Sequence, residues 1–494
     1  MKNKFKIFYV ASEVTPFAGK GPLAETASAL PKALKEMDHD IRVMMPNYRS
    51  VNERKYVLRD VIRLKDMSIK LAQEAFIANG KSAFLPDAKV QIYFFDHKPF
   101  FDRLGLYADP KSKKIYADNA ERFSLFGKGC LETLKMLHWQ PDIIHCNDWQ
   151  SALIPVLLKT THKDDPFFKN TKVVVTVHNF AEQGIFPAAI LKALDLAETT
   201  HYPESQIALD GKFNFLKAGL LSADLISTVG EAHAKQIQQH PNLARGLADI
   251  LQKKRRLFTG VSHAVDTAVW NPAASGHVPH HFAPNDLSGK LRCKKEFLES
   301  VACKFEEGVP LLVLFEPPAA ELSDKLETIV AEALAMNVQV VFLGETGAKS
   351  EKALAKYKKK YAGRFAGQFG YDEAFLHRAC AAADVTFSAA CPSLPVSLVL
   401  SAMQYGALPV IAANSGYTEA VQDYRKPAGA NGFVLPGCEA KDVIKTFKNA
   451  VSLFHDKKRW AKMAKNAMTA NRSWEAVAET YTKLYAQLMA RGKK

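Results

Sequence analysis

The chain has 494 residues, of which 48% are hydrophobic and 24% are charged. This composition is typical of a globular protein and excludes a disordered chain, a collagen-like fibre and a coiled coil, while the length suits two domains of roughly 200–250 residues each. Lys and Arg total 66 against 51 Asp and Glu, and the net charge of +15 favours an anionic partner: nucleotide phosphate, nucleic acid or an acidic surface.

Short β-rich runs alternate with amphipathic helical stretches through the first half of the chain. We expect helices over residues 24–36 and 120–137. The expected strands are residues 6–11, 41–45, 90–95, 143–146, 173–177, 225–229 and 257–261. This β–α alternation predicts a mostly parallel, doubly wound sheet that helices cover on both faces.

The alternation stops over residues 265–286, which are rich in Pro, Ala, His and Asn, and then resumes. The later expected strands are residues 311–315, 338–343, 365–369, 385–388 and 408–412, and a basic helical run covers 460–488. We therefore predict two Rossmann-like α/β domains, 1–265 and 266–494, the second carrying the C-terminal helix. Ligands of open α/β sheets bind beyond the carboxyl ends of the strands, so the expected site is a cleft between the domains.

The seven cysteines are scattered and form no CxxC pair, which favours reduced thiols over a disulfide framework or a zinc site. The N-terminus has only a short apolar run, shorter than a signal peptide needs, and no window approaches 18 apolar residues. We expect a cytoplasmic protein without a membrane partner.

Several motifs follow the expected strands. SEVTPFAGKGPLAETASALPKAL (12–34) places Gly19 and Gly21 between a strand and a helix, where the backbone either approaches a phosphate or simply makes a tight turn. The others, in chain order, are HCNDWQSAL (145–153), TVHNFAEQGIF (176–186), NFLKAGLLSADLISTV (214–229), AVDTAVWNP (264–272), GYDEAFLHR (370–378) and LVLSAMQYGALPVIAANSG (398–416).

Taken together and in this order, the motifs resemble those of bacterial glycogen synthases and plant starch synthases, over essentially the whole chain. The resemblance implies two Rossmann-like domains that face each other across a cleft (GT-B). It also implies a retaining glucosyltransferase that moves glucose from ADP-glucose to an α-1,4-glucan, with UDP-glucose as the alternative donor. The N-terminal domain would then be the acceptor side, and the C-terminal domain would hold the nucleotide sugar.

The resemblance also implies roles for individual residues. Catalytic positions fall on His178, which would contact the transferred glucose, on Asp148, near the reacting sugar, and on Glu13, beside the acceptor. An alternative for Asp148 is an N-cap of the following helix. The positions implied to bind the nucleotide sugar are Lys20, Gly21, Asn179, Gln183, Gly184, Lys325, Tyr371, Ser393, Asn414, Ser415 and Gly416. Tyr371 would pack on adenine; its alternative is a core position.

Retaining transfer develops positive charge at the anomeric carbon and negative charge on the departing diphosphate. Lysine, arginine and backbone N–H groups can stabilise the diphosphate, and the chain has no DxD-like triplet. We therefore expect neither a metal nor a cofactor. The expected partners are the donor nucleotide sugar and the glucan acceptor.

The chain departs from the family at charged groups. The family's phosphate loop carries a lysine before Gly-Gly; here Lys20 comes one position late and Pro22 replaces a glycine. Counting back from the helix ETIVAEAL places Lys325 at the family's phosphate lysine and Ala320 at its arginine. Counting forward from the strand would place Pro317 and Leu322 there instead. Both counts lose the arginine.

Other departures affect the sugar side. The family's EPCGL, whose glutamate binds the sugar, is replaced by a run that begins at Ser393, and serine supplies no carboxylate. Asn414, Ser415 and Gly416 replace the phosphate-cradling Thr-Gly-Gly, and His263 replaces an asparagine. Losing an arginine and a carboxylate together would lower the rate by roughly 10⁴-fold or more. A binding or regulatory homologue with impaired transfer is therefore the alternative to an active synthase, and nucleic-acid binding has no recognised motif to support it.

Overall fold

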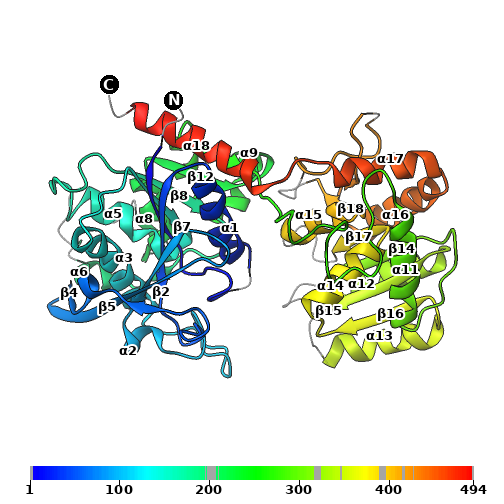
Figure 1. Ribbon diagram of the computed structural model, residues 1–494, viewed down its shortest axis with the longest axis horizontal. Helices are drawn as coiled ribbons and strands as arrows, with labels where there is room; N and C mark the ends of the chain where they lie inside the picture. The colour runs from blue at the N-terminus through cyan, green and yellow to red at the C-terminus, as the bar shows by residue number, and fades with distance from the viewer. Residues whose placement is uncertain are drawn as a thin grey trace. The chain divides into compact units, whose positions relative to one another are not determined.

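The computed structural model describes residues 4–19, 21–194, 196, 207–209, 211–315, 324–344, 348–388, 396–413, 418–426 and 428–491. The chain divides into two compact units, residues 1–262 with 474–494 and residues 263–473 (Figure 1). Within the described residues, no helix is long and apolar enough to cross a membrane.

The first unit is built on a ten-stranded sheet in the order β13-β12-β8-β7-β1-β2-β6-β5-β3, with β4 paired to β5. Its parallel strands are β1 (Lys6–Val10), β2 (Asp40–Pro46), β6 (Gln91–Asp96), β7 (Ile143–Asn147), β8 (Lys172–Val177), β12 (Leu225–Val229) and β13 (Phe258–Val261). All seven were expected from the sequence. The antiparallel strands β3 (Arg59–Asp60), β4 (Met67–Leu71) and β5 (Glu74–Phe84) were missed.

The helices of the first unit follow the alternating pattern. They are α1 (Pro22–Glu36), α2 (Lys98–Phe101), α3 (Asn119–Met136), α4 (Asp148–Ser151), α5 (Leu153–Lys159), α6 (Ile190–Ala193), α8 (Phe215–Ser222), α9 (Glu231–Gln239), α10 (Ala248–Lys253) and α18 (Trp474–Arg491), with 3₁₀ turns η1 (Ile62–Leu64) and η2 (Pro241–Ala244). A small sheet of β9 (Ile185–Phe186), β10 (Ala208–Leu209) and β11 (Lys212–Asn214) lies after β8 in sequence.

The second unit has a six-stranded, wholly parallel sheet in the order β16-β15-β14-β17-β18-β19. Its strands are β14 (Leu311–Phe315), β15 (Gln339–Gly344), β16 (Phe365–Phe369), β17 (Val385–Ser388), β18 (Leu408–Ala412) and β19 (Phe433–Leu435). Its helices are α11 (Ser288–Ser300), α12 (Asp324–Ala335), α13 (Ala348–Lys360), α14 (Glu373–Ala382), α15 (Val396–Gln404), α16 (Ala440–Phe454) and α17 (Lys457–Met468).

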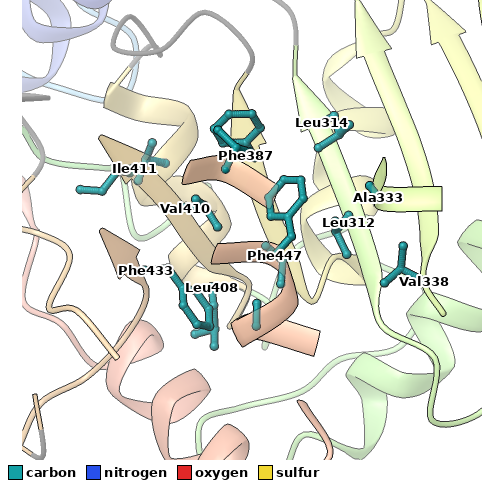
Figure 2. Close-up of a cluster of buried hydrophobic side chains, with 14 of the residues drawn as sticks. Leu312, Leu314, Ala333, Val338, Phe387, Leu408, Val410, Ile411, Phe433 and Phe447 are labelled. Atoms are coloured by element: carbon teal, nitrogen blue, oxygen red, sulfur yellow. The ribbon is translucent and has the colours of Figure 1, made fainter. Parts of the chain in front are cut away.

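Every residue of β14 and β15 is buried, as parallel strands covered on both faces should be. Figure 2 shows one of the resulting clusters, in which Leu312 and Leu314 of β14 lie near Phe387 of β17 and Phe447 of α16. Truncating a side chain in such a cluster to alanine costs about 2–5 kcal/mol. The paired sheets and their apolar clusters are the two Rossmann-like domains that the sequence predicted.

The C-terminal helix belongs to the first unit, so its assignment to the second domain was wrong. The predicted run 460–488 is interrupted after Met468, and α18 then runs along the first unit (Figure 1). Two of its tyrosine hydroxyls reach the interior of the first sheet: Tyr485 lies 2.6 Å from Nδ1 of His145, and Tyr481 lies 3.3 Å from Oγ1 of Thr176. These polar groups are all buried, and each contact gives a hydrogen-bond partner to a group that would otherwise be buried without one.

The expectation of reduced thiols is correct for five cysteines and wrong for a sixth. Cys130, Cys146, Cys293, Cys303 and Cys380 are free and buried. Cys438 is disulfide-bonded, and Cys391 lies outside the described residues. Pairing depends on the distance between Cα atoms in the folded chain, which the spacing of cysteines in the sequence does not give.

Candidate active site

The candidate site lies where the strand order of the first sheet reverses. The chain passes from β1 to β2 on one side, and β7 pairs with β1 on the other. In open α/β sheets, ligands bind beyond the carboxyl ends of the strands at this point, because the loops there diverge and leave a crevice. Glu13 follows β1, Asp148 follows β7 and His178 follows β8, so topology brings these three predicted catalytic residues to one edge.

Asp148 is buried and holds the loop that carries His178. Its Oδ1 accepts a hydrogen bond of 2.7 Å from the backbone N–H of His178 and a weaker one of 3.4 Å from that of Asn179. Its backbone is left-handed, with φ at +53°. The alternative role as a helix N-cap is wrong, because Asn147 occupies that position and no side chain caps α4.

The charge state of Asp148 is set by its surroundings. Burial raises its pKa to about 7, the two backbone hydrogen bonds oppose this, and the charges of Glu182 and Glu13 raise it further. The carboxyl group therefore titrates near neutral pH instead of near its usual 3.8. Glu13 and Glu182 are close enough to Asp148 for their charges to act on it, so the site is an acidic one.

His178 is oriented by Asn147, which sequence reasoning did not single out. The Nδ2 of Asn147 donates to the carbonyl of Val10 at 3.0 Å, which directs its Oδ1 towards Nε2 of His178 at 3.1 Å and the hydroxyl of Tyr9 at 3.0 Å. Because a carbonyl oxygen only accepts, neutral His178 carries its ring proton on Nε2. Nδ1 is then the acceptor nitrogen of the ring. The signal was present in the sequence, since Asn147 immediately precedes Asp148 in the HCNDW motif.

Glu13 is positioned by a tyrosine far away in the sequence. The hydroxyl of Tyr107 donates to Oε1 of Glu13 at 2.6 Å and lies 2.8 Å from Oγ of Ser12. Burial raises the pKa of Glu13, and the Tyr107 hydrogen bond partly lowers it. Gly19 has φ at +85°, and a Cβ there would lie 2.1 Å from Oε2 of Glu13, so only glycine fits beside this carboxylate.

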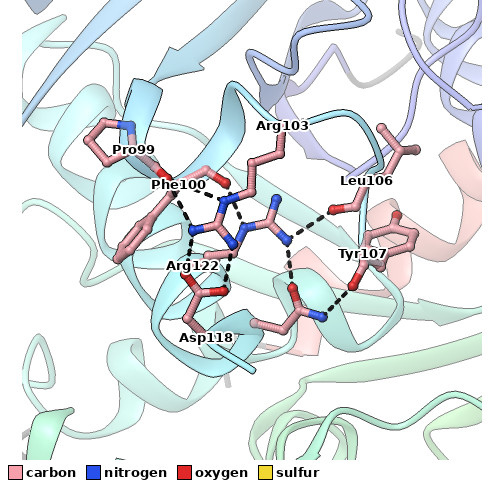
Figure 3. A network of polar contacts seen from close by, with 8 residues as sticks. Pro99, Phe100, Arg103, Leu106, Tyr107, Asp118 and Arg122 are labelled. Atoms are coloured by element: carbon pink, nitrogen blue, oxygen red, sulfur yellow. Dashed lines mark hydrogen bonds and ion pairs between the residues drawn. The ribbon is translucent and has the colours of Figure 1, made fainter. Parts of the chain in front are cut away.

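The loop that carries Tyr107 is fixed by a network of two arginines (Figure 3). Arg122 of α3 is fully buried and donates to the carbonyls of Phe100 at 2.7 Å and Leu106 at 3.0 Å. Arg103 makes a two-pronged ion pair with Asp118, at 2.7 and 2.5 Å. A bidentate pair fixes direction as well as distance, so it ties the start of this loop to Asp118 at the N-terminus of α3.

Replacing Tyr107 by phenylalanine should lower activity several-fold and shift its pH dependence. The pKa of Glu13 would rise further, because burial would act without the opposing hydrogen bond. The acid limb of the rate–pH profile should therefore move to higher pH. Tyr116→Phe is the matched control, since Tyr116 lies in the same loop and contacts Gly105 instead of Glu13. An unchanged profile for Tyr107→Phe would contradict the proposed positioning of Glu13.

Within HNFAEQG, Gln183 and Gly184 shape the loop. Gln183 is buried and bonds to the carbonyls of Phe180 and Arg245 and to Nδ2 of Asn214, so its amide is satisfied by protein. Gly184 has φ at +62°, and a Cβ there would meet the ring of Trp149 at 2.4 Å. Asn179 is exposed, and its Oδ1 accepts from the N–H of Ala181.

Gly21 differs from Gly19 in having space around it. It precedes α1, whose N-terminus has no side-chain cap, and a Cβ built on it meets nothing within 4 Å. None of the described residues therefore requires a glycine at this position. The predicted role, close approach of the backbone to a phosphate, remains a prediction, and Lys20 lies outside the described residues.

Two predicted residues of the second unit, Tyr371 and Lys325, come after the carboxyl ends of parallel strands, β16 and β14. Tyr371 follows β16 and is half-buried, with its ring 6.4 Å from that of Phe375. Lys325 is in the first turn of α12. Ser393, Asn414, Ser415, Gly416 and Ala320 lie outside the described residues. The expectation of a cleft between the two units stays a prediction. Among the described residues, no three His, Cys, Asp or Glu side chains are grouped as metal ligands would be.

The fold of the two Rossmann-like units matches that of known glycosyltransferases. The catalytic domain of starch synthase IV from Arabidopsis thaliana, solved with ADP and acarbose, aligns with a TM-score of 0.85 at 22% identity, over 99% of this chain and 100% of that one. A sucrose-phosphate synthase from Thermosynechococcus elongatus aligns with a TM-score of 0.56 at 14% identity, over 98% and 99%. The fold is therefore of the GT-B class.

Sequence comparison gives the family. Residues 6–253 match the starch synthase catalytic domain. The chain is 30% identical to a glycogen synthase of Pelodictyon phaeoclathratiforme over 99% of both chains, and 33% identical to that of Moorella thermoacetica over 99% of this chain and 98% of that one. This chain belongs to the glycogen and starch synthase family of glucosyltransferases.

Proposed function

We propose that the protein transfers glucose from ADP-glucose to an α-1,4-glucan with retention of anomeric configuration. The observation that carries this proposal is the meeting of Glu13, Asp148 and His178 at the switch point of the first sheet. Two carboxyl groups there can stabilise the positive charge that develops at the anomeric carbon. The imidazole can accept a proton from a sugar hydroxyl or donate one to it.

The diphosphate requires positive charge, which this acidic site does not provide. We assign that role to Lys325 and Lys20, with backbone N–H groups before α1, and we assign adenine packing to Tyr371. The binding of ADP and acarbose by the starch synthase of the same fold supports a nucleoside diphosphate as the donor product. The first unit is then the acceptor side and the second the donor side.

Replacing Lys325 by alanine should weaken ADP binding at least several-fold, because the phosphate loses a charged partner in a partly dry site. Isothermal titration calorimetry measures this directly. Lys352→Ala, an exposed lysine of α13 in the same unit, is the control and should bind ADP as the unchanged protein does. Equal affinities for both variants would refute the assignment of Lys325, and the alternative alignment, with Leu322 at this position, would then be preferred.

A second function is favoured by the departures at Ser393 and Ala320. A homologue without the sugar carboxylate and the phosphate arginine would keep nucleotide-sugar or glucan binding and lose most of its transfer. Incubation with labelled ADP-glucose or UDP-glucose and glycogen separates the two: label in the polymer supports the synthase. Bound donor without labelled polymer supports the binding protein.

The same departures suggest a gain-of-function test. A missing charged hydrogen bond is worth roughly 1.5–3 kcal/mol, or about 10- to 150-fold in rate. Ser393→Glu, combined with Ala320→Arg, should therefore raise transfer if the remaining site is that of a weakened synthase. Lower melting temperature with no gain would mean that the new carboxylate is buried without partners, and would count against the synthase function.

A further inference from the structure

A strongly basic pocket lies in the first unit, apart from the candidate active site. Its volume is about 660 Å³, and it is lined by Lys253, Lys254, Arg255, Arg256, Leu257 and Arg491. Five of these six residues are cationic and none is acidic. The first five immediately precede β13, whereas Glu13, Asp148 and His178 follow their strands, so the pocket is at the opposite edge of the parallel sheet.

The cations of this pocket are not neutralised by the protein around them. Among the described residues, no ion pair joins Lys253, Arg255, Arg256 or Arg491 to a carboxylate. Lys254 is half-buried, and its Nζ donates to the carbonyls of Leu221 and, at 2.8 Å, Ala223. These are neutral acceptors, so the positive charge of the pocket is retained.

Among the described residues, the carboxylate whose charge acts on Lys254 is Asp224, and it is engaged elsewhere. Asp224 forms an ion pair of 3.2 Å with Lys159 and accepts the backbone N–H of Val173 at 2.8 Å. Burial lowers the pKa of Lys254 to about 8, and the charge of Asp224 only partly offsets this. An anion in the pocket would stabilise the charged form of Lys254.

The backbone holds these side chains in a defined arrangement. Leu257 donates its N–H to the carbonyl of Lys254 at 2.7 Å, and its own carbonyl accepts from Ile226 at 2.8 Å, which ties the turn to β12. Helix ends explain part of the charge, since Lys253 and Arg491 lie in the last turns of α10 and α18, where cations are favourable. Arg255 and Arg256 lie beyond the helix and are not explained in this way.

We propose that this pocket binds a small phosphate-bearing molecule at a site distinct from the one that performs transfer. Guanidinium groups bind phosphate through two parallel N–H bonds, and a volume of about 660 Å³ is in the range of small-molecule sites. A pocket of this size can hold a whole phosphorylated sugar or nucleoside monophosphate, and a polyanion such as duplex nucleic acid is the alternative that the test below separates. The proposal does not depend on the activity proposed above.

Calorimetric titration of the full chain with pyrophosphate, a hexose monophosphate and AMP tests this site. Arg255→Gln combined with Arg256→Gln should weaken binding at least about tenfold, because two charge-assisted hydrogen-bonding groups are lost. Lys358→Gln combined with Lys359→Gln removes the same charge from exposed positions of α13 and should leave affinity unchanged. The relative response to the hexose phosphate and AMP identifies the kind of phosphate ester.

Three outcomes would overturn the proposal. The first is no binding of any of these phosphates by the unchanged protein at millimolar concentration. The second is an equal loss in the arginine and lysine variants, which would mean general electrostatic attraction. The third is loss of duplex DNA or anionic vesicle binding in the arginine variant without any effect on the small phosphates. Transfer by the arginine variant without added phosphate should equal that of the unchanged protein.

Discussion

Replacing His178 by alanine is expected to lower the rate of glucose transfer by about 10²–10³-fold, the usual effect of losing one preorganised polar group from an active site. The ring of His178 is oriented by the contact of Nε2 with Asn147, and its backbone is held by the N–H bond to Asp148. Because the alanine variant keeps that backbone bond, the loop should stay in place. The loss should then appear in kcat more than in stability.

The matched control is His162→Ala. This histidine precedes β8 instead of following it, and it lies 3.6 Å from Asp165, away from the carboxyl ends of the strands. Transfer of labelled glucose into glycogen, measured with the melting temperature of each variant, distinguishes the two positions. Similar rates for the two variants would show that His178 is not a catalytic residue.

The parallel strands could be predicted from the sequence because each is a short, continuously apolar run. Residues 311–315 and 408–412 were predicted with the bounds that the structure shows. The antiparallel strands β4 and β5 were missed, since their apolar residues alternate with polar ones and fewer are buried. Met67, Ile69 and Leu71 do show the two-residue period of a strand with one exposed face, so a signal was present.

The site was predictable in its motifs and not in its long-range contacts. HCNDW and HNFAEQG marked the loops after β7 and β8, but whether Asp148 caps its own helix or binds the next loop depends on the pairing of those strands. Tyr107 is 94 positions away from Glu13, and no local pattern connects them. The place of α18 was missed for the same reason, because it depends on buried partners such as His145 in a distant strand.

Asp148→Asn is expected to separate stability from activity. Asparagine has the same shape, tolerates the left-handed backbone at this position and can keep accepting the N–H of His178. It cannot carry the negative charge with which, in our proposal, Asp148 stabilises the reacting sugar. Transfer should therefore fall by about 10²-fold or more, although the loop remains in place.

The stability effect of the same substitution should depend on pH in a defined direction. The pKa of Asp148 is raised from 3.8 in the unfolded chain to about 7 in the folded protein. Burying the ionised carboxylate therefore destabilises the protein progressively from about pH 4 to pH 7, and fully above that. Between pH 5 and pH 8 the destabilisation grows by about 2–3 kcal/mol, which is the part of the shift in pKa that develops over this range.

Asparagine does not titrate, so the melting temperature of Asp148→Asn relative to the unchanged protein should rise between pH 5 and pH 8. Asp118→Asn is the control of opposite sign, because hydrogen bonding and charge from Arg103 hold the pKa of Asp118 below its usual value despite partial burial. Its carboxylate is ionised in both states over this range, so that variant should be less stable by a constant amount. A constant offset for Asp148→Asn as well would mean that Asp148 is fully ionised at pH 5. Such a result would contradict the assignment of a buried carboxyl group that titrates near neutral pH beside the reacting sugar.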